Sequence, residues 1–148
     1  KGNIDFNIIK FRSMKIGAEE NFPLAKDQYH KQITKVGKYL RKYKLDELPQ
    51  LINVLKGDMS FVGPRPVLRK FVDLYTPGQM KVLDIRPGIT DFASIKYRNE
   101  YKILNSVDNP AEYYINVIMQ DKLALNLEYI KNQSLWLDIK LIFKTIFG

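Results

Sequence analysis

The sequence predicts an α+β fold: a single, mostly helical domain with a small β-sheet and amphipathic C-terminal helices. Three patterns predict this class. Residues 4–14 alternate in part and contain Ile and Phe, which is typical of a β-strand. The block LDELPQLINVL carries apolar residues at helical spacing, and residues 109–148 have a helical pattern. A chain of 148 residues has the usual length of one domain, so we expect one domain over residues 1–148.

The first third of the chain is predicted to join short elements through polar loops. Gly17 ends the expected strand, and the polar residues 18–31 form a loop or a short helix. The single histidine, His30, falls in this stretch and is expected at the surface. Thr34 is a suitable N-cap for a helix over residues 34–43.

The next helix is predicted within LDELPQLINVL. Its apolar residues fall at i, i+3, i+4 and i+7, and they are Leu48, Leu51, Ile52 and Leu55. This spacing predicts one buried helix face. Gly57 is expected to end the helix.

Proline and glycine residues predict where elements begin and end in the middle of the chain. Pro66 is expected to begin a helix over VLRKFVDLY, because proline fits a first helical turn, and TPGQMKVLD should form a short helix. The Pro-Gly pair in RPGIT predicts a type II turn with Gly88 at positive φ. The following DFASIKYR reads as a strand.

The last predicted helix begins after Ser134, a good N-cap. Its apolar residues form one broad stripe made of Leu135, Trp136, Ile139, Ile142, Phe143, Ile146 and Phe147. Such a stripe is consistent with packing in the core. The alternative is a helix that lies in a membrane interface, with Trp136 and the phenylalanines in the lipid and lysines at the headgroups.

Composition restricts the function. The net charge of +8 implies an anionic partner, such as phosphates, nucleic acid or acidic lipid. The absence of cysteine excludes disulfides, zinc-thiolate sites and cysteine nucleophiles, and one histidine leaves little room for a multi-histidine metal site. No stretch approaches the ~18 apolar residues of a membrane span.

Asp46 and Glu47 are the candidate reactive centre. Five cations precede them within a few turns, namely Lys35, Lys38, Arg41, Lys42 and Lys44. Capping of a helix start is the plain alternative for adjacent carboxylates. The cations favour phosphate chemistry instead, since carboxylates bind Mg²⁺ that bridges to phosphates, and an aspartate can attack phosphorus.

Two Arg-bearing turns follow the carboxylates. The first consists of Gly63, Pro64, Arg65 and Pro66, and the second of Arg86, Pro87 and Gly88, with Arg98 beyond it. Flanking prolines fix the backbone of Arg65, and a preorganised guanidinium can grip a phosphate through two hydrogen bonds. Each turn is also consistent with an ordinary tight turn. The motifs GxGxxG and GxxxxGK[ST] are absent, so Rossmann and P-loop sites have little support.

Four segments together resemble the bacterial sugar transferase family, the monotopic phosphoglycosyl transferases. They are KFRSM (10–14), TKVGKYLRKYKLDELPQLINVLKGDMSFVGPRP (34–66), RPGIT (86–90) and KLALNLEYIKNQSLWLDIKLIFKT (122–145). The likeness extends from about residue 1 to 147. The block LDELPQLINVLKGDMSFVGPRP is highly specific for this family.

The resemblance implies an enzyme that moves a sugar 1-phosphate from a nucleotide diphosphosugar, commonly a UDP-sugar, to polyprenyl phosphate. Such enzymes release UMP and need Mg²⁺. Asp46 would be the nucleophile and a Mg²⁺ ligand, and Glu47 would act on the acceptor phosphate or the metal. The basic residues that match phosphate- or nucleotide-contacting positions are Lys10, Arg41, Arg65 and Arg98, and Arg86 is a further phosphate-binding candidate.

The resemblance also implies a location. The family carries an N-terminal hydrophobic segment that enters the membrane as a re-entrant helix, and this sequence, which begins Lys-Gly, is expected to start after it. We therefore expect an anionic membrane surface at the cytoplasmic face of the bacterial inner membrane as a partner, and no nucleic acid.

The chain departs from the family pattern at three positions. Asp91, Ser94 and Tyr97 stand where Gly, Gln and Gly are common. An extra carboxylate near the nucleotide site could alter which sugar or base is accepted. The Asp46–Glu47 block is intact.

Two other functions remain open on the sequence. One is an inactive, membrane-associated relative that serves as a scaffold in polysaccharide assembly. The other is a basic binding module for nucleic acid or lipid headgroups, which would bind nucleic acid with a strong salt dependence. No aromatic-interleaved basic strand or recognition helix supports the second.

Overall fold

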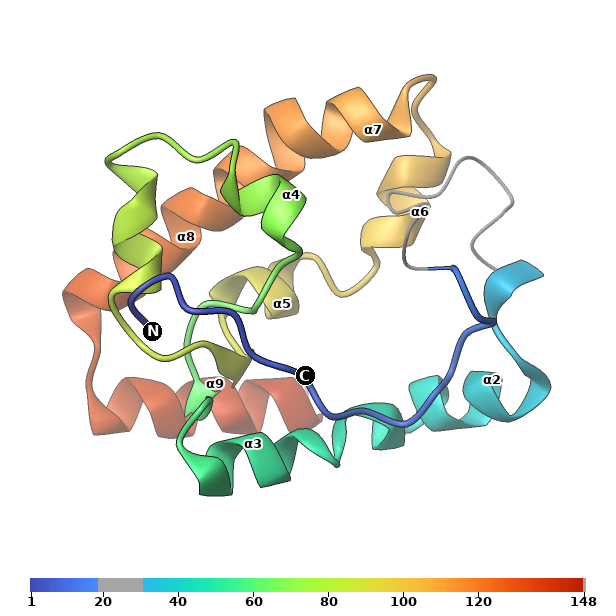
Figure 1. The fold of residues 1–148 in the computed structure, drawn as a ribbon, viewed down its shortest axis with the longest axis horizontal. Helices are drawn as coiled ribbons and strands as arrows, with labels where there is room; N and C mark the ends of the chain where they lie inside the picture. The colour runs from blue at the N-terminus through green and yellow to red at the C-terminus, as the bar shows by residue number, and fades with distance from the viewer. Residues whose placement is uncertain (19–30, 148) are drawn as a thin grey trace.

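A two-stranded parallel sheet lies among short helices in the computed structural model, which describes residues 1–18 and 31–147 (Figure 1). The strands are β1 (Ser60–Val62) and β2 (Gly88–Thr90), with Ser60 opposite Gly88 and Val62 opposite Thr90. The predicted α+β class is confirmed. His30 and all but the ends of the loop or helix predicted for residues 18–31 lie outside the described residues.

The helical elements follow one another closely along the chain. In order they are α2 (Lys35–Lys42), the 3₁₀ turn η1 (Leu45–Glu47), α3 (Gln50–Lys56), α4 (Arg69–Val72), the 3₁₀ turn η2 (Gln79–Leu83), α5 (Phe92–Lys96), α6 (Glu100–Asn105), α7 (Pro110–Tyr113), the π-helical turn η3 (Tyr114–Ile118), α8 (Met119–Asn132) and α9 (Leu135–Phe147). The predicted helical C-terminal part of the chain is confirmed over α7 to α9.

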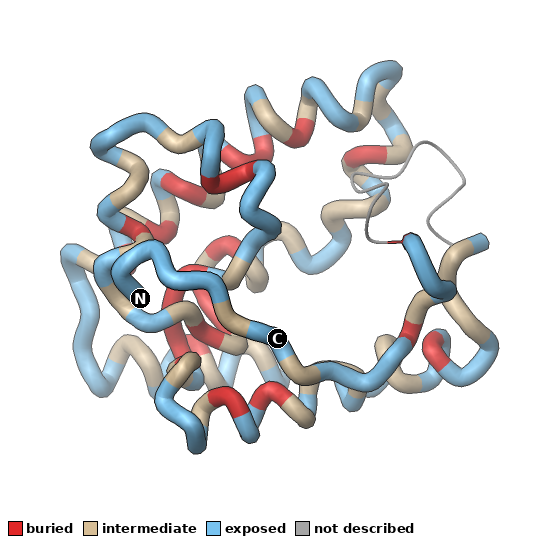
Figure 2. The backbone as a smooth tube through the Cα atoms, viewed as in Figure 1, coloured by how far each residue is buried: buried red, intermediate tan, exposed pale blue. Residues whose placement is uncertain are grey.

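The core has two parts, which Figure 2 shows as buried segments along α8 and around the central strands. The first joins α4, η2, α6, η3 and α8 through Phe71, Val82, Leu104, Tyr114, Ile118, Met119 and Leu123. The second joins β1, α8 and α9 through Val62, Tyr129 and Leu141. The second cluster fixes α9 against the sheet, next to the turns that carry the arginines.

Residues 4–14 do not form the predicted strand. Among the described residues of this segment, Met14 alone makes a bridge, to Ile33. The segment runs beside α3 instead (Figure 1), where Ile9 N donates to Asn53 Oδ1 at 2.9 Å and Asn53 Nδ2 donates to Asn7 O at 2.9 Å. The prediction is wrong because a side-chain amide, rather than a neighbouring strand, satisfies these backbone groups.

The helix caps predicted around α2 and α3 are confirmed. Thr34 Oγ1 accepts a hydrogen bond from Gly37 N at 2.9 Å at the start of α2. Gly57 ends α3 with φ 82, a left-handed conformation that glycine adopts without cost. Both features depend on local chemistry, which a sequence shows directly.

The face that α3 buries is the opposite of the predicted one. The four apolar residues Leu48, Leu51, Ile52 and Leu55 are exposed, and Leu55 reaches 88%. The buried residues of α3 are Gln50 and Asn53, and Asn53 is only 1% exposed. The periodicity correctly predicted which residues share a face. The prediction that the apolar face is the buried one was wrong. The opposite face is buried, because the amide of Asn53 has its hydrogen-bond partners in the N-terminal segment.

Two predicted elements differ near the sheet. Leu68 stays extended with ψ 144, so α4 begins at Arg69 and not at Pro66. DFASIKYR forms helix α5 and not a strand, because the Asp91 carboxylate caps it and accepts from Ser94 N at 2.6 Å. The short helix predicted over TPGQMKVLD is confirmed as η2.

Gly88 does not take the predicted positive φ, since it opens strand β2. Gly88 must be small because a Cβ there would lie 2.1 Å from the backbone N of Gly63. Likewise, a Cβ at Gly63 would lie 2.5 Å from Arg86 O. The two Arg-bearing turns therefore touch backbone to backbone. This contact requires glycine at both positions.

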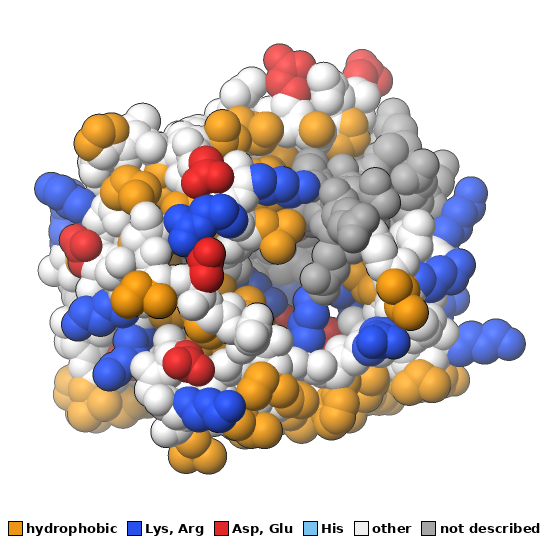
Figure 3. Space-filling model, viewed as in Figure 1, with side chains coloured by type: hydrophobic (Ala, Val, Ile, Leu, Met, Phe, Trp, Pro, Cys, Tyr) orange, Lys and Arg blue, Asp and Glu red, His pale blue; other side chains and the backbone are white. Residues whose placement is uncertain are grey.

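Helix α9 begins as predicted at Ser134, whose Oγ accepts from Leu137 N at 3.2 Å. Leu141 faces the core and Ile142 packs against it. The exposed members of the stripe are Leu135, Trp136, Ile139, Phe143, Ile146 and Phe147. The prediction of core packing is therefore wrong for most of the stripe. Apolar side chains lie exposed along the lower edge of the molecule, where α9 and α3 lie (Figure 3).

Candidate active site

Asp46 lies in η1, in the turn between α2 and α3. Neither η1 nor α3 has a side-chain hydrogen bond at its cap, so helix capping does not explain this carboxylate. Ser13 Oγ donates to Asp46 Oδ2 at 3.2 Å, while Arg41 Nε donates to Ser13 Oγ at 2.9 Å and lies 3.7 Å from the same Oδ2. A hydroxyl and a guanidinium thus hold a carboxylate that remains 13% exposed.

Ser13 was not predicted as a site residue. It is buried, and its carbonyl oxygen accepts from Thr34 N at 3.1 Å. A Cβ at Gly37 would lie 2.0 Å from that oxygen, so the glycine lets α2 pack directly against Ser13. The signal in the sequence was the position of Ser13 inside the family block KFRSM, next to a predicted basic residue.

Glu47 is paired with Arg65. Arg65 Nη1 donates to Glu47 Oε2 at 3.1 Å, and Arg65 Nη2 is bonded to the other oxygen, Oε1. Arg65 Nη1 also donates to Ile89 O at 3.2 Å, so strand β2 helps to orient the guanidinium. Burial disfavours the charge of Arg65, but the hydrogen bonds and negative charge of Glu47 outweigh it and raise the pKa of Arg65.

Two further cations converge on the end of α9. Arg98 Nη2 donates to Lys144 O at 3.3 Å and to Thr145 O at 3.2 Å, and Lys44 Nζ donates to Thr145 O at 3.4 Å. The C-terminal carbonyls of a helix carry partial negative charge and therefore favour cations. Partial burial, followed by the charge of Arg98, lowers the pKa of Lys44, and Glu47 opposes this shift. Lys44, Arg98 and Arg65 therefore form one positive region around Glu47.

Thr145 ties this positive region to the sheet, and no pattern in the sequence predicted it. Its Oγ1 donates to Leu141 O at 2.8 Å and lies 2.5 Å from Thr90 Oγ1. Because the single proton of Thr145 is used on Leu141, Thr90 is the donor between the two hydroxyls. The end of α9 is thereby fixed to the strand that precedes α5.

The remaining predicted cations are placed differently. Phe11 N donates to Asp46 O at 3.0 Å, which brings the backbone next to Lys10 into contact with the segment of the candidate carboxylates. Arg86 Nη2 lies 4.0 Å from the Cβ position of Gly57, at the far end of α3. A helix rises 1.5 Å per residue, so about 10 Å separate that end from the start of α3 next to Glu47. The structure does not bring Arg86 to Asp46.

The three departures from the family pattern take structural positions. Asp91 is fully buried, and its Oδ2 accepts from Arg65 N at 3.3 Å. The hydroxyl of Tyr97 donates to Asp121 Oδ2 at 2.8 Å, on helix α8. The side-chain oxygen of Ser94 is buried without a hydrogen-bond partner. Asp91 thus fixes the turn that carries Arg65, and it does not present a carboxylate to solvent.

Comparison with known protein families shows one to which this chain is similar over its whole length. The family model described as bacterial sugar transferase matches residues 1–148. The chain belongs to the bacterial sugar transferase family.

Curated relatives of the bacterial sugar transferases match almost the whole chain. One is the UDP-N-acetylgalactosamine-undecaprenyl-phosphate N-acetylgalactosaminephosphotransferase of Aeromonas hydrophila, at 41% identity over 99% of this chain and 32% of that protein. Another is the UDP-glucose:undecaprenyl-phosphate glucose-1-phosphate transferase of Escherichia coli K12, at 39% identity over 93% of this chain and 28% of that protein. The uncharacterized sugar transferase EpsL of Bacillus subtilis is 37% identical over 95% of this chain and 61% of its own length. The chain thus spans 28% to 61% of the length of these relatives.

Proposed function

We propose that this chain carries the catalytic domain of a phosphoglycosyl transferase, which moves a sugar 1-phosphate from a nucleotide diphosphosugar to polyprenyl phosphate. One observation carries the proposal: the two adjacent carboxylates have different partners, Asp46 the Ser13 hydroxyl and the Arg41 guanidinium, and Glu47 the Arg65 guanidinium. Relatives named as transferases of N-acetylgalactosamine and glucose phosphates support the same reaction class.

The first step is attack by Asp46 on the donor. A carboxylate oxygen of Asp46 bonds to the β-phosphorus of a UDP-sugar, the bond from that phosphorus to the bridging oxygen breaks, and UMP leaves with its electron pair. The product is an aspartyl phosphosugar on the enzyme. Ser13 and Arg41 orient the attacking carboxylate through their contacts with Oδ2.

The second step transfers the phosphosugar to the acceptor. A phosphate oxygen of polyprenyl phosphate attacks the same phosphorus, the bond to Asp46 breaks, and a polyprenyl diphosphosugar leaves. Glu47 lies next to Asp46 in the chain, and we assign it to the acceptor phosphate. Arg65, Lys44 and Arg98 supply fixed positive charge for the phosphates in both steps.

The carboxylates fit a Mg²⁺ ion in part. The described residues contain no group of three or more His, Cys, Asp or Glu side chains placed to hold a metal. Two adjacent carboxylates still match Mg²⁺, which keeps several waters and also binds substrate phosphates. Asp46 is the better ligand of the two, because Glu47 would have to share both oxygens with Arg65. A bound Mg²⁺ would neutralise charge on the diphosphate.

The apolar faces of α3 and α9 support binding to an anionic membrane surface at the cytoplasmic face of the inner membrane. Exposed apolar side chains cover both helices, and Trp136 is 82% exposed. The exposed Lys140 and Lys144 lie on α9 among them, which matches anionic headgroups. In the described part of the chain, no helix has the length and apolar character needed to cross a bilayer.

The activity is tested by UMP release. The protein as the cell makes it is incubated with Mg²⁺, polyprenyl phosphate and a panel of UDP-sugars that includes glucose, galactose and N-acetylgalactosamine. We expect UMP release with at least one donor and a matching lipid-linked diphosphosugar. Absence of UMP release with every donor, from a folded protein, would support the inactive scaffold instead.

The membrane contact is tested by the fluorescence of Trp136, the single tryptophan of this chain. Vesicles that contain phosphatidylserine should shift its emission to shorter wavelength, and added salt should weaken the binding. Phe143→Asp should reduce the shift, whereas Leu74→Asp, at a similarly exposed position away from α9, should not. If vesicles did not change the emission, the proposed membrane contact of α9 would be wrong.

A further inference from the structure

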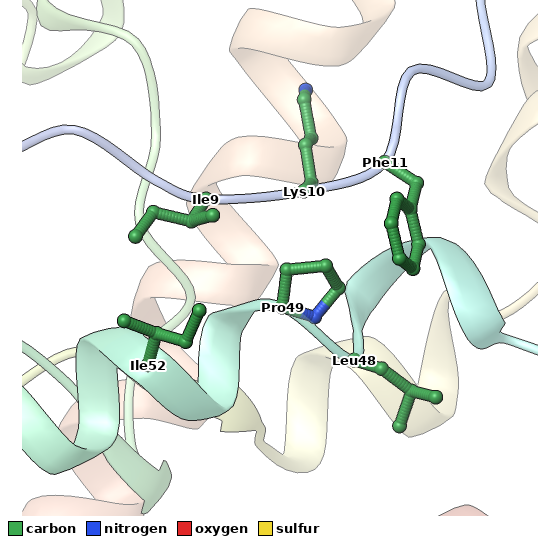
Figure 4. A pocket seen from close by; sticks show the side chains of 6 residues that line it. All are labelled: Ile9, Lys10, Phe11, Leu48, Pro49 and Ile52. Carbon is green, nitrogen blue, oxygen red and sulfur yellow. The ribbon is translucent and has the colours of Figure 1, made fainter.

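An apolar pocket of about 560 Å³ lies between the N-terminal segment and the start of α3, at residues that follow Asp46 and Glu47 in the chain (Figure 4). It is lined by Ile9, Lys10 and Phe11 from the N-terminal segment and by Leu48, Pro49 and Ile52 from the stretch that enters α3. Figure 4 shows Ile9 and Ile52 extending toward one another and the Phe11 ring beside Pro49, while the Leu48 and Lys10 side chains point away from these residues. The walls are thus apolar, with one cation outside them.

The walls of this pocket are fixed to the reactive centre. Phe11 N donates to Asp46 O at 3.0 Å, and Leu48 follows Glu47 directly in the chain. On the other side, Asn53 holds the wall through its bond from Ile9 N at 2.9 Å. Backbone contacts therefore attach the pocket walls to the segment that carries Asp46 and Glu47.

The pocket also opens onto the exposed face of α3. Leu48 and Ile52 line the pocket and belong to that face, which continues to Leu51 and Leu55. Apolar side chains thus extend from the pocket to the surface that we assign to the membrane. Apolar side chains left in water are costly, which favours a hydrocarbon occupant over a polar one.

We propose that this pocket binds the isoprene units next to the phosphate of the polyprenyl phosphate acceptor. This inference rests on the function proposed above. The acceptor has an anionic head on an unsaturated hydrocarbon chain, which matches an apolar groove that begins at a cation-rich site. The donor matches it poorly, because its sugar hydroxyls, diphosphate and ribose would lose hydrogen bonds to water against apolar walls.

The test separates the two halves of the reaction. Farnesyl phosphate serves as a short acceptor, and exchange of labelled UMP into the UDP-sugar in the absence of acceptor reports the donor step alone. Ile52→Gln places a polar group in the pocket wall and keeps a good helix former in α3. Ile52 is 45% exposed, so the fold should tolerate the change, and Leu48→Gln is a second variant of the same wall. Leu74→Gln, 49% exposed and outside the pocket, is the control.

We expect each wall variant to raise the KM for farnesyl phosphate by about three- to tenfold, while UMP exchange stays at the wild-type rate. Leu74→Gln should change neither quantity. Unchanged acceptor KM in both wall variants would overturn the proposal, and so would an equal rise in Leu55→Gln, which changes the exposed face outside the pocket. A loss of UMP exchange in the wall variants would assign the pocket to the donor. Wild-type protein without UMP exchange or release would contradict the proposed function itself.

Discussion

Asp46→Asn should reduce UMP release by about 10⁴-fold or more, which is the scale of losing a covalent nucleophile. The substitution keeps the size of the side chain. It replaces a carboxylate oxygen with an amide group that does not attack phosphorus. The measurement is the initial rate of UMP release at saturating UDP-sugar and acceptor. The wild-type protein, mixed with donor alone, should also gain the mass of a phosphosugar, and the variant should not.

The control for this substitution is Asp84→Asn, an exposed aspartate at the end of η2. It should keep the wild-type rate, because nothing places Asp84 near the carboxylates. Glu47→Gln should lower the rate of the second step more than the exchange of UMP, since Glu47 is assigned to the acceptor phosphate. An Asp46→Asn protein that releases UMP at the wild-type rate would remove Asp46 as the nucleophile.

Gly88→Ala should lower the free energy of unfolding by about 3 kcal/mol or more. The new Cβ would lie 2.1 Å from Gly63 N and 2.6 Å from Val62 C, and both are backbone atoms of the paired segment. Relief of this clash requires β1 and β2 to separate, which would also displace Arg65 from Ile89 O. Urea unfolding followed by circular dichroism measures the change in stability, and UMP release measures the displacement of Arg65.

Gly78→Ala provides a matched control for the same substitution. Gly78 has φ −68, and no atom lies within 4 Å of the position of its Cβ. Its unfolding free energy should stay within about 1 kcal/mol of the wild type, with a small gain from the less flexible unfolded chain. If Gly88→Ala unfolded at the same urea concentration as Gly78→Ala, the close contact between the two turns would be wrong.

The local features of this chain were predictable because their causes lie within a few residues. Thr34 and Ser134 cap helices through hydrogen bonds that span three residues, and Gly57 ends α3 because it can adopt positive φ. The pair Asp46–Glu47 stood out through neighbouring cations in the sequence, and Arg41 and Arg65 do contact these carboxylates.

Other parts of the site depend on contacts between segments far apart in the chain. Ser13 reaches Asp46 across 33 positions, and Thr145 reaches Thr90 across 55. No spacing rule covers such separations along the chain, so the contacts made by Ser13 and Thr145 were not predictable. Arg86 was predicted to belong to the site because it lies in an Arg-bearing turn. Its guanidinium lies at the far end of α3 instead.

By itself, the sequence determined the α+β class, the N-caps of α2 and α9, the end of α3 and the candidate reactive pair, because propensity, capping and local charge are properties of short segments. Only the tertiary structure decided which way the apolar face of α3 points, why Gly88 is glycine, and how Asp46 is held. The physical reason is the same in each case. A periodic pattern states which side chains share a face, while the partners that satisfy Asn53, Gly63 and Asp46 come from elsewhere in the chain.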